Sequence, residues 1–230
     1  MGTLYLVRHG QASFGADDYD RLSELGWRQS RRLGQWLAQS ATAQDAPFAA
    51  VLTGTLRRHA ETWQGMAEGA GAALAGLQPL ALPGLNEYDS HAVIHAIHPE
   101  PLPKPDTPEL YRLHFRLLRQ GLAAWMAGQA APQGMPRYAD FVHGIDDALN
   151  RVRQQHAGQR VLLVSSGGPI ATAVGRVLGT APETSIELNL RIRNTALTEF
   201  VFTPKRHALL SFNTLPHLDG ADWRDWQTYA

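Results

Sequence analysis

The chain has 230 residues, 44% of them hydrophobic, so one domain spanning residues 1–230 can bury a full core. Its 21 basic and 21 acidic residues balance, which gives no field that would attract nucleic acid or an anionic membrane. The absence of cysteine excludes disulfides, thiolate metal sites and cysteine nucleophiles. With no signal-peptide pattern at the N-terminus and no apolar run of about 18 residues, we expect a cytoplasmic protein.

The first predicted element is a buried strand over residues 4–8, which ends on Arg8, His9 and Gly10. Arg8 offers a planar fork of donors to phosphate oxygens, and His9 can act as a nucleophile. Gly10 lets the backbone approach a ligand closely. The alternative is that both side chains satisfy ordinary surface hydrogen bonds. The strand end therefore predicts an anion site if other elements contribute to it.

Helices and strands alternate in the next part of the chain. Ser23 can cap a helix over about residues 24–39, and a short apolar strand follows at 48–53. A second helix is expected over about 56–70, followed by a weak strand near 77–82. This order favours a mostly parallel sheet with helices on both faces.

Two arginines fall in the first turn of the second predicted helix. Arg57 and Arg58 lie where the free backbone amides of a helix also face outward. The two side chains either contribute to an anion site or are solvated on the surface.

The pattern changes between Glu87 and about Arg137, where five prolines interrupt the residues 99–108. A helix is expected over about 108–127 and another over about 138–156. We interpret residues 88–137 as a helical lid packed over the active edge of the sheet, because the block is too short to hold its own core.

A fully apolar strand at 161–165 is the clearest central strand of the chain. Two glycines and Pro169 then open a helix that ends near Gly179, and the amides of residues 166–168 can cradle a phosphate. Residues 195–201 and 207–212 alternate as edge strands do. Together the elements predict an α/β three-layer sandwich with a mostly parallel central sheet.

The motifs at these element ends resemble those of the histidine phosphatase superfamily, the phosphoglycerate mutase-like proteins. Leu-Val-Arg-His-Gly at residues 6–10 resembles the signature whose histidine is phosphorylated directly. Residues 53–62 resemble the motif Ser-Pro-Leu-x-Arg-Ala-x-x-Thr, with Arg58 on the arginine position. Residues 85–89 resemble a Leu-x-Glu segment, so Glu87 is the expected proton donor and Asp89 the alternative.

The chain departs from the family pattern at two positions. Residues 161–170 resemble a segment written Val-Ser-His-Gly-Gly, but Ser166 stands where the family has its second histidine. A hydroxyl supplies a neutral donor in place of a cation there. Gly15 stands where many members have a phosphate-binding asparagine, and we expect Gln11 and Ser13 to supply part of that contact.

The resemblance implies transfer of a phosphoryl group through a covalent intermediate, with no metal or cofactor. The expected catalytic residues are His9, Arg8, Arg58, Glu87 and Ser166, and the expected substrate-binding residues are Gln11, Ser13 and Gly167. The partner is then a small phosphorylated substrate.

Three functions fit these motifs. The first is a phosphatase acting on a small phosphomonoester; the second is a catalytically weak phosphate-binding or interaction protein, favoured by Ser166 and Gly15. A phosphoglycerate mutase fits less well, because the insertion is proline-rich. Substrate identity and oligomeric state are left open.

Some residues outside the motifs have more than one interpretation. His91, His95 and His98 either hold a metal, replace the missing imidazole, or lie solvated at the pocket mouth. Residues 194–195 either support the site from behind or cap a turn. Residues 223 and 226 are tryptophans that either form a contact patch or pack back on the sheet.

Overall fold

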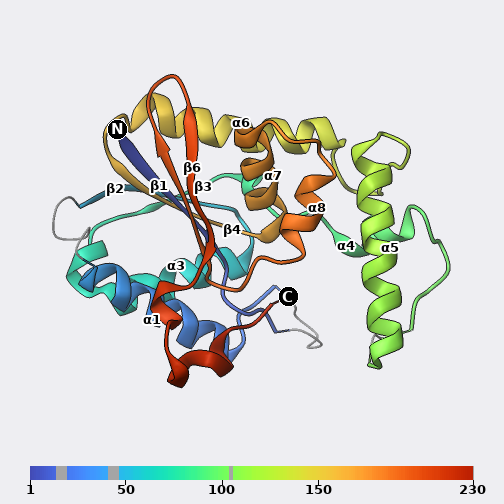
Figure 1. Cartoon of the computed structure of the whole chain (residues 1–230), viewed down its shortest axis with the longest axis horizontal. Helices are drawn as coiled ribbons and strands as arrows, with labels where there is room; N and C mark the ends of the chain where they lie inside the picture. The colour runs from blue at the N-terminus through green and yellow to red at the C-terminus, as the bar shows by residue number, and fades with distance from the viewer. Residues whose placement is uncertain (14–19, 41–46, 104–105, 230) are drawn as a thin grey trace.

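The computed structural model describes residues 1–13, 20–40, 47–103 and 106–229 (Figure 1). Within these residues, six strands form one sheet in the order β3-β2-β4-β1-β5-β6. The strands are β1 (Gly2–Arg8), β2 (Phe48–Thr53), β3 (Pro79–Ala81), β4 (Arg160–Ser165), β5 (Leu197–Phe202) and β6 (His207–Thr214). The first four run parallel, and β5 and β6 are antiparallel to their neighbours. The predicted mostly parallel α/β sheet is confirmed.

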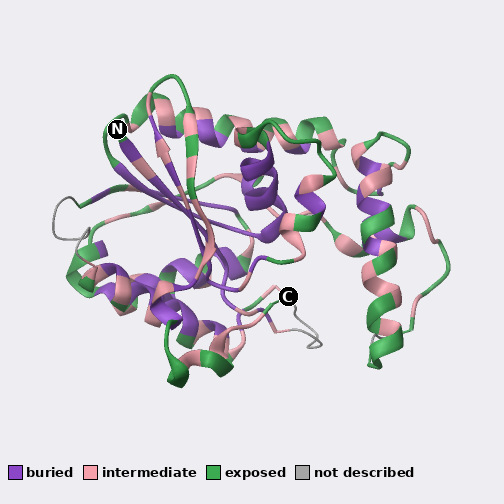
Figure 2. Ribbon diagram, in the orientation of Figure 1, coloured by how far each residue is buried: buried purple, intermediate pink, exposed green. Residues whose placement is uncertain are grey.

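Helices cover both faces of this sheet (Figure 1). On one face lie α1 (Glu24–Gln39) and α3 (Arg57–Ala70). On the other lie α6 (Tyr138–Gln155) and α7 (Gly167–Leu178). Figure 2 shows the central strands β1, β2 and β4 largely buried between the two helical layers, which is the predicted three-layer arrangement.

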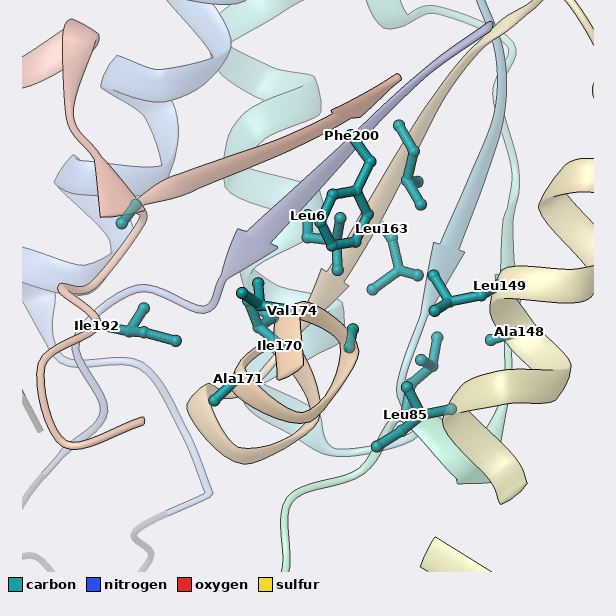
Figure 3. Packing of buried hydrophobic residues seen from close by; sticks show 14 of the residues in the cluster. Leu6, Leu85, Ala148, Leu149, Leu163, Ile170, Ala171, Val174, Ile192 and Phe200 are labelled. Carbon is teal, nitrogen blue, oxygen red and sulfur yellow. The ribbon is translucent and has the colours of Figure 1, made fainter. Parts of the chain in front are cut away.

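Alternation along the strands divides the core into two halves. Leu4 and Leu6 of β1 pack with the side of the sheet under α6 and α7, whereas Tyr5 and Val7 pack with the α1 and α3 side. Figure 3 shows the first half, where Leu6, Leu163 and other apolar side chains meet α7. Burial on both faces explains why β1 and β4 are continuously apolar.

Local signals set the helix ends as expected. The side chain of Ser23 accepts a hydrogen bond from the Gly26 amide and starts α1. Gly179 ends α7, where it adopts a left-handed conformation with φ 67°.

The predicted edge position of the strand at residues 195–201, which is β5, was wrong. β5 is an inner strand between β1 and β6, and not an edge strand. Its alternating pattern reflects one face under helices and one face that is partly covered, which a strand inside an antiparallel pair can also have.

The middle block contains α4 (Ser90–His95) and α5 (Pro108–Met126), and α5 stands beside α6 and α8 (Thr184–Asn189) (Figure 1). Trp125 of α5 packs against Tyr138 and Phe141 of α6, with ring centroids 5.2 and 5.3 Å away. The block therefore shares its core with the main sheet.

Short 3-10 turns complete the chain: η1 (Gly71–Leu74), η2 (Pro83–Leu85), η3 (Pro216–Leu218) and η4 (Ala221–Trp226). Trp223 and Trp226 of η4 are partly buried against the core, so they pack back on the molecule. Among the residues described, no helix has the length and apolar character needed to cross a membrane.

Candidate active site

The register of the central strands brings two motifs together. Arg8 at the end of β1 pairs with Ser165 at the end of β4, so His9 and Ser166 leave the sheet side by side. The His9 amide donates to the Ser165 carbonyl at 2.9 Å. β2 ends on the other side of β4, where the Gly54 amide donates to the Val164 carbonyl at 3.1 Å. Three carboxyl ends of parallel strands thus form one edge.

The His9 imidazole is buried and held in one tautomer. Its Nδ1 lies 2.7 Å from the Gly10 carbonyl oxygen. Because a carbonyl oxygen only accepts hydrogen bonds, Nδ1 carries the proton and Nε2 keeps its lone pair. Burial, followed by the charges of Arg58 and Arg8, holds the pKa of His9 well below its ordinary value. A neutral imidazole with a free Nε2 is a nucleophile.

The second motif directs one of its two arginines toward this histidine. Arg58 is buried and forms an ion pair with Asp20 at 2.7 Å, and the Arg57 amide donates to the same carboxylate at 2.9 Å. The Arg57 side chain is exposed and pairs with Glu61 at 2.7 Å. Arg58 is therefore the arginine of the site, whereas Arg57 belongs to the surface.

Arg8 is also buried, and its guanidinium donates to the Ile192 carbonyl. Thr62 of α3 ties the first two motifs together, since its hydroxyl oxygen accepts from the Gly10 amide at 3.0 Å and its proton goes to the Arg58 carbonyl at 2.7 Å. The positions of Arg58 and His9 are thus set by one hydrogen-bonded link.

Glu87 reaches the start of α7 from the segment after η2. Its carboxylate accepts from the Gly168 amide at 3.1 Å, and a Cβ on Gly168 would lie 2.1 Å from a Glu87 oxygen. Burial raises the pKa of Glu87, and the Gly168 amide, Arg58 and Arg8 oppose that rise. The raised pKa is the condition that a proton donor at neutral pH needs.

Asp89, the alternative donor, caps α4 instead. Its carboxylate accepts from the amides of His91 and Ala92 at 2.8 and 3.1 Å. The Asp89 carboxylate is therefore engaged at the start of α4.

The motif comparison overlooked His59, whose imidazole contacts Ser166. Nε2 of His59 shares a 2.7 Å hydrogen bond with the Ser166 hydroxyl, and both side chains are fully buried. The His59 ring centroid lies 5.8 Å from that of His9. Burial, with the charge of Arg58, lowers the pKa of His59 to about 3. The signal was in the sequence, because His59 stands on the alanine position of Ser-Pro-Leu-x-Arg-Ala.

The expected substrate-binding residues lie around this edge with partners of their own. The Gln11 carboxamide oxygen accepts from the Ser23 hydroxyl at 2.8 Å, which links it to the start of α1. The Ser13 amide donates to the Arg21 carbonyl at 2.9 Å, and Gly167 is the first residue of α7. Gly15 lies outside the described residues.

A loop behind the site supports the backbone of Arg8 and His9. The Thr195 amide donates to the Arg8 carbonyl at 3.1 Å, and the Asn194 side-chain amide donates to the His9 carbonyl at 3.3 Å. Thr195 has φ 55°, and its hydroxyl shares a 2.9 Å hydrogen bond with buried His217. These contacts favour support of the site over an ordinary turn cap.

Within the described residues, His91, His95 and His98 do not come together as a metal site. His91 and His95 lie exposed on α4, whereas His98 lies beyond its end, so the three do not share one helix face. The ring of His91 instead approaches that of His114 at 6.4 Å. Across residues 1–13, 20–40, 47–103 and 106–229, no group of three or more metal-ligating side chains is present.

Sequence and structure comparisons agree with this arrangement. The family model of the histidine phosphatase superfamily (branch 1) matches residues 4–215, and the chain belongs to that family. None of the curated proteins is similar enough to count as a match.

Solved structures share the fold. Phosphoserine phosphatase from Entamoeba histolytica, in complex with 3-phosphoglyceric acid, has 19% identity and a TM-score of 0.64, covering 95% of this chain and 100% of its own. Mycobacterial glucosyl-3-phosphoglycerate phosphatase with inorganic phosphate has 22% identity and a TM-score of 0.64, covering 94% and 99%. Phosphoglycerate mutase from Bacillus anthracis str. Sterne has 20% identity and a TM-score of 0.63, covering 94% of each chain.

Proposed function

We propose that the protein is a phosphatase that hydrolyses a phosphomonoester of a small metabolite through a phosphohistidine on His9. The observation that carries this proposal is the state of His9: it is buried, has a lowered pKa and has its proton fixed on Nδ1. Nε2 is therefore an unprotonated nucleophile beside two guanidinium groups. A general surface histidine would have none of these properties.

In the first step, Nε2 of His9 attacks phosphorus in line with the leaving oxygen. Arg8 and Arg58, together with the Ser166 hydroxyl and the amides at the start of α7, stabilise the charge on the three equatorial oxygens. The P–O bond to the leaving group breaks as the P–N bond forms. Glu87, whose pKa is raised by burial, transfers its carboxyl proton to the leaving oxygen.

In the second step, water replaces the first product. The Glu87 carboxylate removes a proton from water as the oxygen attacks phosphorus, and the P–N bond breaks. Inorganic phosphate leaves, and both His9 and Glu87 return to their starting states. Asp89 is a poorer donor for this cycle, because its carboxylate is held by the two α4 amides.

The substrate class follows from the site and from relatives of the same fold. Proteins of this fold include phosphatases of phosphoserine and of glucosyl-3-phosphoglycerate, which are small phosphorylated metabolites. Gln11, Ser13 and the Gly167 amide lie at the same edge and are proposed to contact the phosphate. Residues 88–137 are proposed to act as a lid that sets specificity. A cytoplasmic location stays a prediction.

A phosphate-ligand-binding protein without turnover is the second candidate. It is favoured by Ser166 and Gly15, the two departures of the chain from the family pattern. A mutase is a third, weaker candidate, and dependence on a bisphosphorylated primer would distinguish it from a phosphatase.

The test is phosphate release from a panel containing phosphoserine, glucosyl-3-phosphoglycerate and an aryl phosphate. Wild type is compared with His9→Ala and with His143→Ala, which alters an exposed imidazole on α6. We expect turnover by wild type and by the His143 variant, and none by His9→Ala. Tight phosphate binding without release by any of them would favour the binding protein.

A further inference from the structure

A buried imidazole–hydroxyl pair joins two elements at the phosphoryl site. His59 comes from the first turn of α3 and Ser166 from the residue before α7, and they share a hydrogen bond of 2.7 Å. Neither side chain is exposed. Serine hydroxyls and histidines are expensive to bury unless their polar atoms are used, so the pair calls for an explanation.

The space around the pair is shaped for this imidazole. A Cβ on Gly54 would lie 2.2 Å from Nδ1 of His59, so a larger residue at that position would displace the ring. Gly54, His59 and Ser166 meet at one point. The absence of a side chain at Gly54 leaves room for the imidazole ring that reaches Ser166.

We propose that His59 is a positioning residue that acts through Ser166, so that the pair supplies the donor to the transferring phosphoryl group. This inference rests on the proposed phosphatase function. Nε2–H of His59 donates to the Ser166 oxygen, which leaves the serine proton free for a phosphoryl oxygen.

The direction of these hydrogen bonds follows from the charge of the ligand. In the described part of the chain, Nδ1 of His59 has no hydrogen-bond partner, so either neutral tautomer leaves one ring nitrogen unpaired. A phosphate dianion attracts the serine proton, and the serine oxygen then needs a donor of its own. Binding therefore selects the tautomer protonated on Nε2. A chain of two aligned hydrogen bonds also polarises the serine O–H, which strengthens its bond to the anion.

The neighbourhood keeps this imidazole neutral. Arg58 precedes His59 in the chain, and together with burial it lowers the pKa of His59 to about 3. The ring can therefore serve as a hydrogen-bond donor to serine without becoming a cation. In this arrangement the imidazole of His59 is neutral and bonds Ser166, whereas Arg8 and Arg58 supply the positive charge at the site. A cationic histidine in direct contact with the phosphoryl group would supply positive charge itself.

A double-mutant cycle on a substrate that the wild type hydrolyses tests the coupling. The variants are Ser166→Ala, His59→Phe, which keeps a ring and removes both nitrogens, and the double variant. We expect each single change to lower kcat on the order of 100-fold with little change in KM, because the donor acts on charge developed in the transition state. The double variant should stay within about twofold of Ser166→Ala alone.

His217→Phe is the matched control. His217 is also buried, also bonds a hydroxyl, that of Thr195, and also has a pKa lowered to about 3. In the double variant of His217→Phe and Ser166→Ala, the fold-loss of kcat should equal the product of the two single fold-losses, because the two residues act independently. If His59→Phe does not fold, as judged by thermal unfolding, His59→Ala takes its place in the cycle.

The proposal would be overturned if the kcat losses of the His59 and Ser166 variants multiplied in the double variant. A His59 variant with wild-type kcat would also overturn it. Nitrogen NMR of the His59 ring with bound inorganic phosphate gives a readout independent of turnover: Nδ1 should be unprotonated, and a protonated Nδ1 would contradict the assigned direction. A wild type that releases no phosphate would count against the phosphatase function instead, and a His9→Ala variant that still releases phosphate would count against the intermediate on His9.

Discussion

At the scale of single residues, the chemistry of the site depends on how burial changes protonation. The same loss of water lowers the pKa of His9 and raises the pKa of Glu87, so burial favours the free base on His9 and the protonated acid on Glu87. Arg58 and Arg8 add to the first shift and oppose the second. Both directions are the ones that the proposed mechanism requires, with His9 as nucleophile and Glu87 as proton donor.

Glu87→Gln tests the acid directly. Glutamine keeps the shape and cannot release a proton, so kcat for an alkyl phosphomonoester should fall at least on the order of 100-fold. In the wild type, kcat for that substrate should fall as the pH rises past the pKa of Glu87, because the acid is then ionised. Steady-state assays across pH measure both effects.

Asp89→Asn is the matched control for that substitution. It replaces the carboxylate that caps α4 with a carboxamide that caps a helix equally well, so stability should change by less than about 0.5 kcal/mol and kcat should stay within a few-fold of wild type. A larger loss of kcat in Asp89→Asn than in Glu87→Gln would assign the acid to Asp89.

The residues that sequence alone could and could not place differ in kind. Arg8, His9 and Glu87 stand in short motifs at strand or segment ends, where neighbouring parallel strands bring them together. His59 stands inside the second motif, but its role, like that of Asp20, depends on which side chains meet across α3, α7 and the loop before α1. Long-range contact is not encoded in spacing along one element.

At the scale of elements, local signals were sufficient for most boundaries. The α1 cap at Ser23 and the α7 end at Gly179 are set by residues next to the helix itself. The inner position of β5 was missed because alternation reports which faces are buried and not which strands pair at the edges. The packing of α5 on α6 likewise depends on tertiary contacts of Trp125.

Close packing of α1 on α3 gives a prediction at this scale. A Cβ on Gly34 would lie 2.0 Å from the Met66 carbonyl oxygen, which is backbone and cannot move aside cheaply. Gly34→Ala should therefore lower the free energy of unfolding by about 1–3 kcal/mol, despite the better helix propensity of alanine.

Chemical denaturation measures this difference, and Gln35→Ala, on the exposed side of the same helix, serves as the control. The control should change stability by less than about 0.5 kcal/mol. Equal stability of Gly34→Ala and wild type would mean that the two helices are not in such close contact.

At the scale of the whole molecule, three buried neutral imidazoles couple folding to pH. The pKa values of His59 and His217 are lowered to about 3 by burial and nearby arginines, and that of His9 is also lowered. Unfolded histidine titrates near 6.5, so the unfolded chain takes up protons that the folded chain excludes. Stability is then full above pH 6.5 and falls between pH 6.5 and 3, whereas the raised pKa of Glu87 acts in the opposite direction.

For His217, whose pKa is lowered to about 3, the expected size of this effect is about 1.6 kcal/mol between pH 6.5 and 5. Urea unfolding at the two pH values measures it in the wild type and in His217→Gln. The variant should show a smaller difference by about that amount. An unchanged difference would show that His217 is not held neutral by the fold.

The central claim is that His9 carries the phosphoryl group. Mixing enzyme with substrate, quenching at alkaline pH, where phosphohistidine survives, and locating the modification by mass spectrometry tests it most directly. We predict one phosphate on Nε2 of His9, formed within a single turnover and absent from His9→Ala. Rapid phosphate release with no modified His9, or with phosphate on another residue, would contradict the account.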